Sequence, residues 1–215
     1  MPKLTAIRKR AIDGMMKESL FDASIAVLAE YGVEGMTMDR VAAAAGVAKG
    51  SLYHYFGSKK DLLQFVYTKI IDPVIQDMTE TLTRNQPVIE KLRSHLRRIL
   101  EHVAQHVQVF KLLFNNDTGR GLLQSSERTM HELGCRQTAE LFRQGIAEGV
   151  IAPADPVVLA RMFLGLCQGT LDDNPDIVDP EQRERLLCLI MSVFLNGIGT
   201  EKGRTAKGRV VKDGI

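Results

Sequence analysis

An all-α fold is predicted by three features of the sequence. Apolar residues recur at spacings of three and four, no segment alternates between apolar and polar residues, and no Asn-Gly or Asp-Gly pair joins two alternating segments as a hairpin would. Hydrophobic residues make up 45% and charged residues 25% of the 215 residues, which is typical of a folded globular protein. We expect about nine helices, in one or two domains.

The first three elements are expected to be helices of unequal length. Residues 20–31 form one broad apolar face, and Gly32 follows where a helix C-cap belongs. Thr37 is a good N-cap for a short second helix that ends near Ala45. A third short helix is expected over residues 48–55.

Each later helix has its own start signal. Ser58 and Asp61 form a capping box that opens a fourth helix, and Pro73 is expected to kink or end it. Pro87 fits a first helical position, Ser126 is suited to an N-cap, and two later Asp-Pro pairs combine both signals. The acidic, proline-containing segment 172–179 is expected to be a loop. The expected later helices cover about 87–107, 126–149, 155–171 and 179–196.

Charge is distributed unevenly along the chain, although the net charge is only +2. Residues 1–60 carry +3, residues 61–200 carry −4 and residues 201–215 carry +3. Basic ends suggest a polyanion partner, but terminal lysines and arginines also simply keep a chain soluble. There is no apolar run of about 18 residues, no secretory signal, and no disulfide or zinc pattern among the three cysteines. We therefore expect a cytoplasmic protein with no membrane partner.

The stretch 37–56, TMDRVAAAAGVAKGSLYHYF, carries the most specific pattern in the chain. Gly46 stands between two short predicted helices, where a tight turn favours a residue that tolerates a positive φ. Ala42 is small enough to let the helices cross closely, and Leu52 is expected to point back into the core. Ala, Gly and Leu at these spacings are typical of a helix-turn-helix. A plain αα-corner inside an all-α protein is the alternative.

Polar residues around this turn favour the helix-turn-helix interpretation. The helix after the turn is very short and rich in hydrogen-bond donors, which suit base edges and phosphates. An N-terminal arm with Lys3, Arg8, Lys9 and Arg10 precedes the motif, and no acidic residue occurs among the first ten. Both features indicate a nucleic-acid surface.

Residues 17–67 resemble the DNA-binding domain of tetracycline-repressor (TetR) type transcriptional regulators. The resemblance rests on LFxA at 20–23, EYG at 30–32, TMxxVA at 37–42, AGVAKGSLYHYF at 45–56 and SKxxL at 58–62. A weaker similarity to the family's C-terminal helices covers residues 149–171. Ala48 departs from the pattern, because Ser or Thr often caps the recognition helix there, and the arm is longer than in minimal members.

The resemblance implies two domains and a set of DNA contacts. Residues 1–62 would be the DNA-binding domain with its basic arm and the motif at 37–56, and residues 63–200 a ligand-binding and dimerisation domain. For residues 201–215 the composition, rich in Gly, Lys and Arg and without periodicity, predicts a basic, disordered tail. The first residues of the recognition helix would face the major groove, while the flanking side chains would contact phosphates or base edges. The predicted contacts are Thr37, Lys49, Gly50, Ser51, Tyr53, His54 and Lys59.

A short recognition helix reads few base pairs, so two copies about 34–36 Å apart on a palindromic operator are expected. By resemblance, the two Asp-Pro helices would form a four-helix bundle with a second copy of the chain. Packing inside one chain is the alternative for their apolar residues. The predicted dimerisation residues are Leu159, Phe163, Leu166, Leu187, Ile190 and Phe194.

The middle helices are expected to enclose a pocket for a small effector. An apolar lining suggests an apolar or amphipathic effector. The resemblance to the TetR family implies that binding of this effector would release a repressor from DNA. The predicted lining residues are Leu96, Leu100, Val103, Phe110, Phe114, Met130 and Phe142.

No cofactor and no metal site are expected. His102 and His106 are spaced as a metal pair, but no further ligand follows in a tight pattern, so partly buried or surface histidines are the preferred interpretation. The chain has no P-loop, no GxGxxG and no visible catalytic constellation, so we do not expect an enzyme. An all-α enzyme and a helical protein-interaction module without DNA binding are the alternatives.

Overall fold

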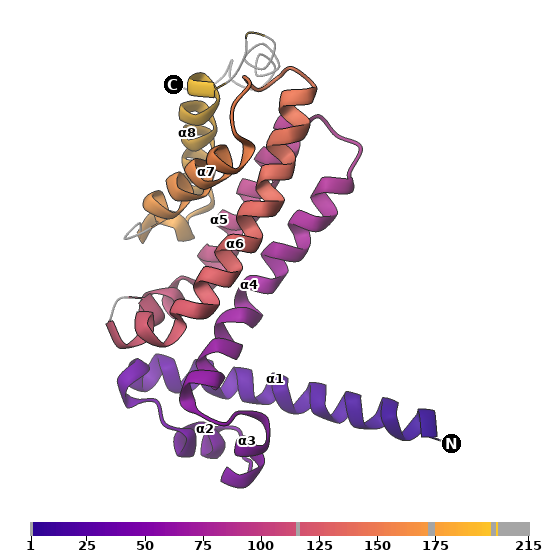
Figure 1. The fold of residues 1–215 in the computed structure, drawn as a ribbon. Coiled ribbons are helices and arrows are strands. Elements are labelled where there is room, and N and C mark those ends of the chain that lie inside the picture. Colours follow the sequence, from indigo (N-terminus) through magenta and orange to yellow (C-terminus); the bar gives the residue numbers. More distant parts are fainter. Residues whose placement is uncertain (1, 115–116, 172–174, 199–200, 202–215) are drawn as a thin grey trace. The chain divides into compact units, whose positions relative to one another are not determined.

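The computed structural model describes residues 2–114, 117–171, 175–198 and 201. Within these residues the regular structure consists of eight α-helices and one 3-10 helix, without a β-strand (Figure 1). The all-α prediction is therefore confirmed. The helices are α1 (Pro2–Gly35), α2 (Met38–Ala44), α3 (Lys49–Tyr55), α4 (Lys59–Thr83), α5 (Val88–Phe114), α6 (Asp117–Ala147), α7 (Pro156–Leu171), η1 (Pro175–Val178) and α8 (Pro180–Ile198).

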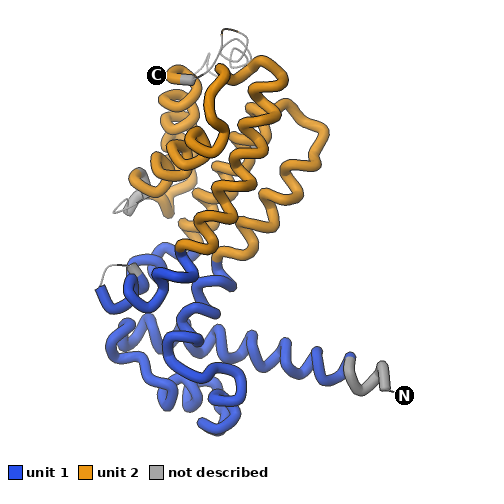
Figure 2. Tube along the Cα trace, viewed as in Figure 1, with its two compact units in different colours: residues 1–70, 106–127 blue, residues 71–105, 128–215 orange. Residues whose placement is uncertain are grey.

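The chain divides into two compact units, shown in different colours in Figure 2. The first unit comprises residues 1–70 and 106–127, and the second comprises residues 71–105 and 128–215. Helices α4, α5 and α6 each contribute residues to both units. The predicted functional domains, 1–62 and 63–200, stay a prediction, because compactness alone does not reveal which residues bind DNA. The predicted tail lies outside the described residues except for Glu201.

Several predicted helix starts are confirmed by their hydrogen bonds. The Thr37 hydroxyl oxygen accepts from the Arg40 amide (3.2 Å), and the Ser58 hydroxyl oxygen accepts from the Asp61 amide (3.2 Å). The two Asp-Pro starts use the same device. The carboxylates of Asp155 and Asp179 each accept a backbone N–H from two residues further on, at 2.8 and 3.0 Å. A side-chain oxygen thus satisfies an otherwise unpaired amide at the beginning of each helix.

Other predicted boundaries are wrong. The fifth helix continues to Phe114 instead of ending near Val107, and α6 begins at Asp117, so Ser126 lies inside it. Helix α4 does not end at Pro73 but continues to Thr83, while the alternative of a kink at Pro73 stays a prediction. The N-terminal arm is helical, because α1 extends from Pro2. The predicted helix end at Gly32, in contrast, is confirmed: Gly32 has a non-helical φ of +66°, and two helical segments meet there at a kink.

The core of the first unit joins α3 and α4 to the C-terminal part of α1. Leu20, Leu52 and Leu62 are completely buried, and the Phe65 ring lies 4.9 Å from Phe56 and 6.5 Å from Phe21, centroid to centroid. Burying such side chains contributes roughly 1.5–3 kcal/mol each. Short helices such as α2 and α3 are marginal alone, so this tertiary packing holds them in place.

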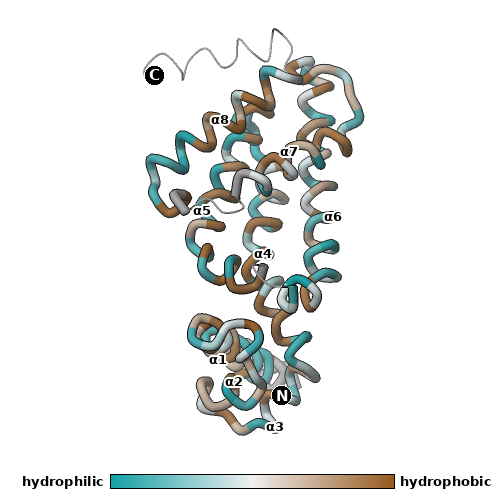
Figure 3. Tube along the Cα trace, turned by 90° about the vertical axis from the view of Figure 1, so that its left-hand side faces the viewer, coloured by the Kyte–Doolittle hydropathy of each residue, from teal (hydrophilic) through white to brown (hydrophobic). Residues whose placement is uncertain are grey.

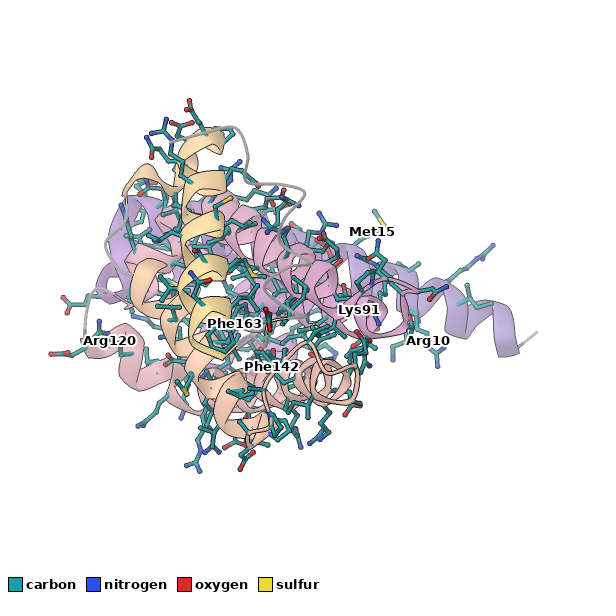
Figure 4. The ribbon with its side chains drawn as sticks, turned by 90° about the horizontal axis from the view of Figure 1, so that it is seen from above. Arg10, Met15, Lys91, Arg120, Phe142 and Phe163 are labelled. Atoms are coloured by element: carbon teal, nitrogen blue, oxygen red, sulfur yellow. The ribbon has the colours of Figure 1, made fainter. Side chains whose placement is uncertain are left out.

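The core of the second unit is centred on three phenylalanines from α6, α7 and α8. The rings of Phe142, Phe163 and Phe194 lie 5.1 to 6.0 Å apart, and Figure 4 shows the first two near one another. The helices carry hydrophobic and hydrophilic residues in alternating bands (Figure 3), as amphipathic helices do. No helix in the described ranges combines the length and apolar character needed to cross a bilayer.

Candidate nucleic-acid interface

The turn between α2 and α3 has the geometry predicted for a helix-turn-helix. Gly46 has φ of +66°, a conformation that glycine adopts without a Cβ clash. The amides of Gly46 and Val47 donate to the carbonyls of Ala43 and Ala42, at 3.1 and 3.0 Å. Ala42 is 3% exposed, so α2 packs closely at the turn. The turn therefore fixes the direction in which α3 leaves α2.

Helix α3 has one buried residue and an exposed polar surface. Leu52 is completely buried, and Phe56, its C-cap, is also buried. The five predicted contact residues of this helix are all exposed: Lys49, Gly50, Ser51, Tyr53 and His54. Nothing lies within 4 Å of a Cβ built on Gly50, so the backbone there is open to close approach. Their exposure is confirmed, and their contact with DNA stays a prediction.

The first turn of α3 carries an ion pair that the sequence analysis did not foresee. Lys49 Nζ lies 2.7 Å from Asp39 Oδ1 and 5.9 Å from the centre of the Tyr53 ring. The hydrogen bond to Asp39 raises the pKa of Lys49. Both partners of the pair are more than half exposed, so solvent screens it, and a DNA phosphate can compete for the ammonium group. The expected absence of a cap at Ala48 is confirmed, since no side chain caps α3.

Two further predicted contacts lie at helix starts next to α3. Thr37 is exposed, with its hydroxyl oxygen occupied as the N-cap acceptor of α2. Lys59, the first residue of α4, is half-buried, and its Nζ donates to the Glu34 carbonyl oxygen at 3.4 Å. Burial lowers the pKa of Lys59. Its role as a backbone contact stays a prediction.

The structure reveals two contacts that hold α3 and α2 against α1. The Tyr55 hydroxyl donates to Asp13 Oδ1 at 2.9 Å, and the Arg40 guanidinium lies over the Tyr31 ring, 4.2 Å from its centre, while donating to the Gly35 carbonyl. Asp13 and Tyr55 are 42 residues apart, so no local pattern could have predicted their bond. The Asp13–Tyr55 bond ties the N-terminal half of α1 to α3, and the Arg40 contacts tie the C-terminal end of α1 to α2.

The N-terminal half of α1 presents cations and apolar groups to solvent. Arg8, Lys9 and Arg10 are exposed, whereas the side chain of Lys3 lies outside the described residues. Met15 is 74% exposed, and Figure 4 labels it with Arg10 on this helix. Among the described residues, no group of three or more His, Cys, Asp or Glu side chains is placed to hold a metal ion.

The predicted dimerisation residues lie largely in the core of their own chain. Phe163 is completely buried, and Leu166 is half-buried. The remaining four are buried as well: Leu159, Leu187, Ile190 and Phe194. The exposed apolar residues on the same helices are different ones, namely Val158, Met162, Leu189 and Val193, each about half exposed. Both the buried and the exposed set contain pairs spaced i and i+4, so this spacing alone does not tell the two sets apart.

The predicted pocket residues are divided between the units. Leu96, Leu100 and Phe142 are buried in the second unit. Three others are half-buried: Val103 and Met130 in the second unit, and Phe110 in the first. The side chain of Phe114 lies outside the described residues. That these residues line one pocket stays a prediction.

Comparison with known proteins agrees with the geometry around the turn. Residues 20–66 match the family model described as "Bacterial regulatory proteins, tetR family". The fatty acid metabolism regulator protein of Bacillus subtilis is 33% identical over 188 residues, covering 81% of this chain and 90% of that protein. The HTH-type transcriptional regulator YhgD of the same organism is 25% identical over 183 residues, covering 85% and 96%.

Among solved structures, the SmeT–triclosan complex superimposes with a TM-score of 0.73 at 20% identity, covering 87% of this chain and 93% of that chain. SmeT is the repressor of the Stenotrophomonas maltophilia multidrug efflux pump SmeDEF. At this level of identity the likeness concerns the fold, and it extends well beyond the helix-turn-helix.

Proposed function

The chain belongs to the tetR family of bacterial regulatory proteins and is a transcriptional regulator, and from that premise we propose that it is a homodimeric repressor released from a palindromic operator by a small effector. The observation that carries the proposal is the polar, exposed surface of α3 above the buried Leu52. A helix of this kind suits the major groove of DNA. The protein would act in the cytoplasm, where bacterial DNA lies.

Some of the proposed contacts position the protein on the DNA backbone, and others read the base sequence. Lys49, Gly50 and Ser51 at the start of α3 face base edges, while Tyr53 and His54 contact a phosphate or a base edge. Thr37 and Lys59 add contacts to the DNA backbone from the starts of α2 and α4. The exposed cations of α1 extend the basic surface next to α3. With about four phosphate contacts per subunit, affinity should fall steeply with salt.

The dimer would form through the exposed apolar faces of α7 and α8. Val158 and Met162 on α7, and Leu189 and Val193 on α8, recur at helical spacing and are 48–58% exposed. On α7 the same face continues through Gly165 and Gly169, where a Cβ would meet nothing within 4 Å. Open glycines let a partner helix approach closely, which supports helix-on-helix packing between two copies.

The effector would bind in the second unit, among the apolar residues of α4 to α8. An apolar or amphipathic molecule fits the largely aliphatic and aromatic core of that unit. Two similar proteins support a ligand-responsive repressor: one is named as a regulator of fatty acid metabolism, and SmeT was solved with triclosan. A coupling of about 1–3 kcal/mol between effector and operator would be enough for regulation.

A gel-shift titration with the DNA that flanks the protein's own gene tests this proposal. We expect one discrete complex at nanomolar protein whose affinity survives excess nonspecific DNA. Sedimentation of the same complex should report two chains for each operator. If no flanking fragment is bound above the nonspecific level, the proposal is wrong. Failure of every candidate effector to alter the affinity would remove the ligand-responsive part alone.

A further inference from the structure

The N-terminal half of α1 presents an apolar face to solvent. Figure 1 shows this part of the helix projecting beyond α2 and α3. Ile7 is 62% exposed and Met15 is 74% exposed, and Ala11 and Gly14 between them are exposed as well. These four residues recur at spacings of three and four, so they lie on one side of the helix, which we call the outer stripe.

The outer stripe faces away from α3. The Asp13 carboxylate accepts a hydrogen bond from the Tyr55 hydroxyl at 2.9 Å, which identifies the side of α1 that faces α3. Ala11 and Met15 are each two residues from Asp13, and at about 100° per residue they lie on the opposite side. Leu20, seven residues after Asp13 and therefore on its side, is completely buried, in agreement with this assignment. DNA held by α3 would leave the outer stripe uncovered.

The two ends of the outer stripe carry charges of opposite sign. Arg8 and Arg10 are exposed on either side of its N-terminal end. Glu18 and Asp22 continue the stripe at spacings of three and four towards its other end, and both are exposed. Glu18 is paired with Lys69, yet its side chain is 66% exposed. A parallel second copy would set like charges side by side, whereas an antiparallel copy sets the basic end against the acidic end.

The outer stripe is therefore complementary to itself. A two-fold axis at the level of Asp13 sets Ala11 of one copy against Met15 of the other, and Arg8 against Glu18. A Cβ built on Gly14 would meet nothing within 4 Å, so the centre of the stripe is open to a close neighbour. Each contact then occurs twice, as in any two-fold interface between identical chains.

We propose that two copies of this chain pair antiparallel through the outer stripe. This interface lies in the first unit and is distinct from the α7–α8 face of the second unit. From Ile7 to Asp22 the stripe is about 22 Å long, which makes a small interface. Pairing is therefore weak between single contacts and becomes stronger when several copies are held close together.

A membrane surface and DNA fit the outer stripe less well than a second copy. Anionic lipids would attract the arginines, but Glu18 and Asp22 lie on the stripe itself and would be repelled. The phosphates of DNA would be repelled in the same way and provide no apolar counterpart to Ile7 and Met15. An antiparallel copy provides both an apolar surface and the opposite charge at each end.

The pairing has a consequence for DNA that rests on the function proposed above. Gly50 and His54 are each two residues from the buried Leu52, so they lie on the side of α3 opposite the core. Two chains joined through their outer stripes would carry these α3 surfaces on opposite outer sides of the α1 pair. The pair would therefore join two separate DNA segments instead of reading two half-sites of one operator.

Sedimentation equilibrium of the full chain without DNA tests the pairing. Wild type should associate beyond its smallest species, and Met15→Glu should weaken this step at least about tenfold. Lys9→Ala is the control, because it changes the charge equally at an exposed position two residues before Ala11, on the opposite side of the helix. It should associate as the wild type does.

A charge exchange tests the antiparallel arrangement. Arg8→Glu should weaken association, and Arg8→Glu combined with Glu18→Arg should restore it, because the opposite charges then face each other again. Equal association of wild type and Met15→Glu, or no restoration by the exchange, would overturn the inference. Binding of wild type, but not of Met15→Glu, to vesicles of phosphatidylcholine and phosphatidylserine would assign the stripe to lipid and would also overturn it.

A capture assay tests the consequence for DNA. A bead-bound fragment of the DNA that flanks the protein's own gene should retain a second, fluorescent fragment when wild type is added. Met15→Glu should not retain it, although it should shift a single fragment in a gel as wild type does. Equal capture by both proteins would contradict the bridging. Absence of any gel shift would count against the proposed function alone, because sedimentation without DNA reports the pairing independently.

Discussion

The helix-turn-helix at 37–56 and the helical bundle of the second unit distribute their polar groups in opposite ways. In the first region the polar side chains of α3 are exposed above a single buried leucine. In the second region the polar side chains of interest, Thr81, His95 and Thr138, are buried among apolar residues. The first arrangement suits a large, rigid, charged partner such as DNA, whereas the second places polar groups out of reach of such a partner.

The two regions also differ in how strongly a side-chain substitution affects folding. Side chains of α3 can be changed at little cost in folding, because few of them contact the core. Side chains of the bundle contribute to packing and to the proposed ligand site at once. Four predictions test this difference between the regions, and the change with the largest expected effect comes first.

Truncating one aromatic residue in each region should give unequal losses of stability. Phe163→Ala removes a completely buried ring from the phenylalanine cluster, so the free energy of unfolding should fall by about 3–5 kcal/mol. Tyr53→Ala removes a ring that is 44% exposed and should cost less than about 1 kcal/mol. Urea denaturation at a fixed protein concentration measures both. Similar losses would show that the contrast between the regions is wrong.

The buried imidazole should make stability depend on pH. The folded chain holds His95 neutral, with a pKa of about 4, whereas the unfolded chain binds a proton below about pH 6.5. Stability is therefore lost as the pH falls through this window, by up to about 3 kcal/mol at pH 4. In His95→Gln this part of the loss should vanish. Parallel unfolding curves of wild type and variant from pH 7 to 4 would contradict the burial of His95.

DNA binding should depend on the exposed residues of α3 without a matching loss of folding. The double variant Lys49→Ala, Tyr53→Ala should bind its operator at least about 100-fold more weakly, because it loses a cation and a phosphate donor in each subunit. Its unfolding curve and sedimentation should stay close to those of the wild type. Arg128→Ala, which removes an exposed cation from α6 in the second unit, is the charge-matched control and should bind normally.

The smallest effect should come from the ion pair on the recognition helix. Asp39→Asn frees the Lys49 ammonium for phosphate and removes one negative charge facing DNA, so affinity should rise about threefold to tenfold at low salt. The gain should shrink as salt increases. In a Lys49→Ala background most of the gain should be absent, which a double-mutant cycle would measure. An undiminished gain there would assign the effect to general charge alone.

Elements governed by short-range chemistry were predictable from the sequence. Gly46, Thr37 and Ser58 each act within three or four residues of their own position, so a turn or a cap can be read locally. The start of α6 could not be found in this way. Its first turns contain Gly119 and Gly121, which are poor helix formers, and buried residues such as Leu123 anchor them through tertiary packing.

The sequence also could not show which apolar residues lie in the core and which lie on the surface. Phe163 and Met162 are adjacent in sequence and similar in hydrophobicity, yet one is completely buried and the other is 55% exposed. Only the placement of α6 and α8 around α7 distinguishes them. The Asp13–Tyr55 bond and the ion pair of Lys49 likewise depend on how helices meet, which no local pattern encodes.

Hydroxyl-radical and methylation footprinting of the protein on its own flanking DNA tests most directly whether α3 enters the major groove in two copies. We predict two protected major-groove patches related by a two-fold axis, with centres about one helical turn apart, and loss of both patches in the Lys49→Ala, Tyr53→Ala variant. A single patch, protection restricted to the minor groove, or unchanged protection with that variant would contradict the account.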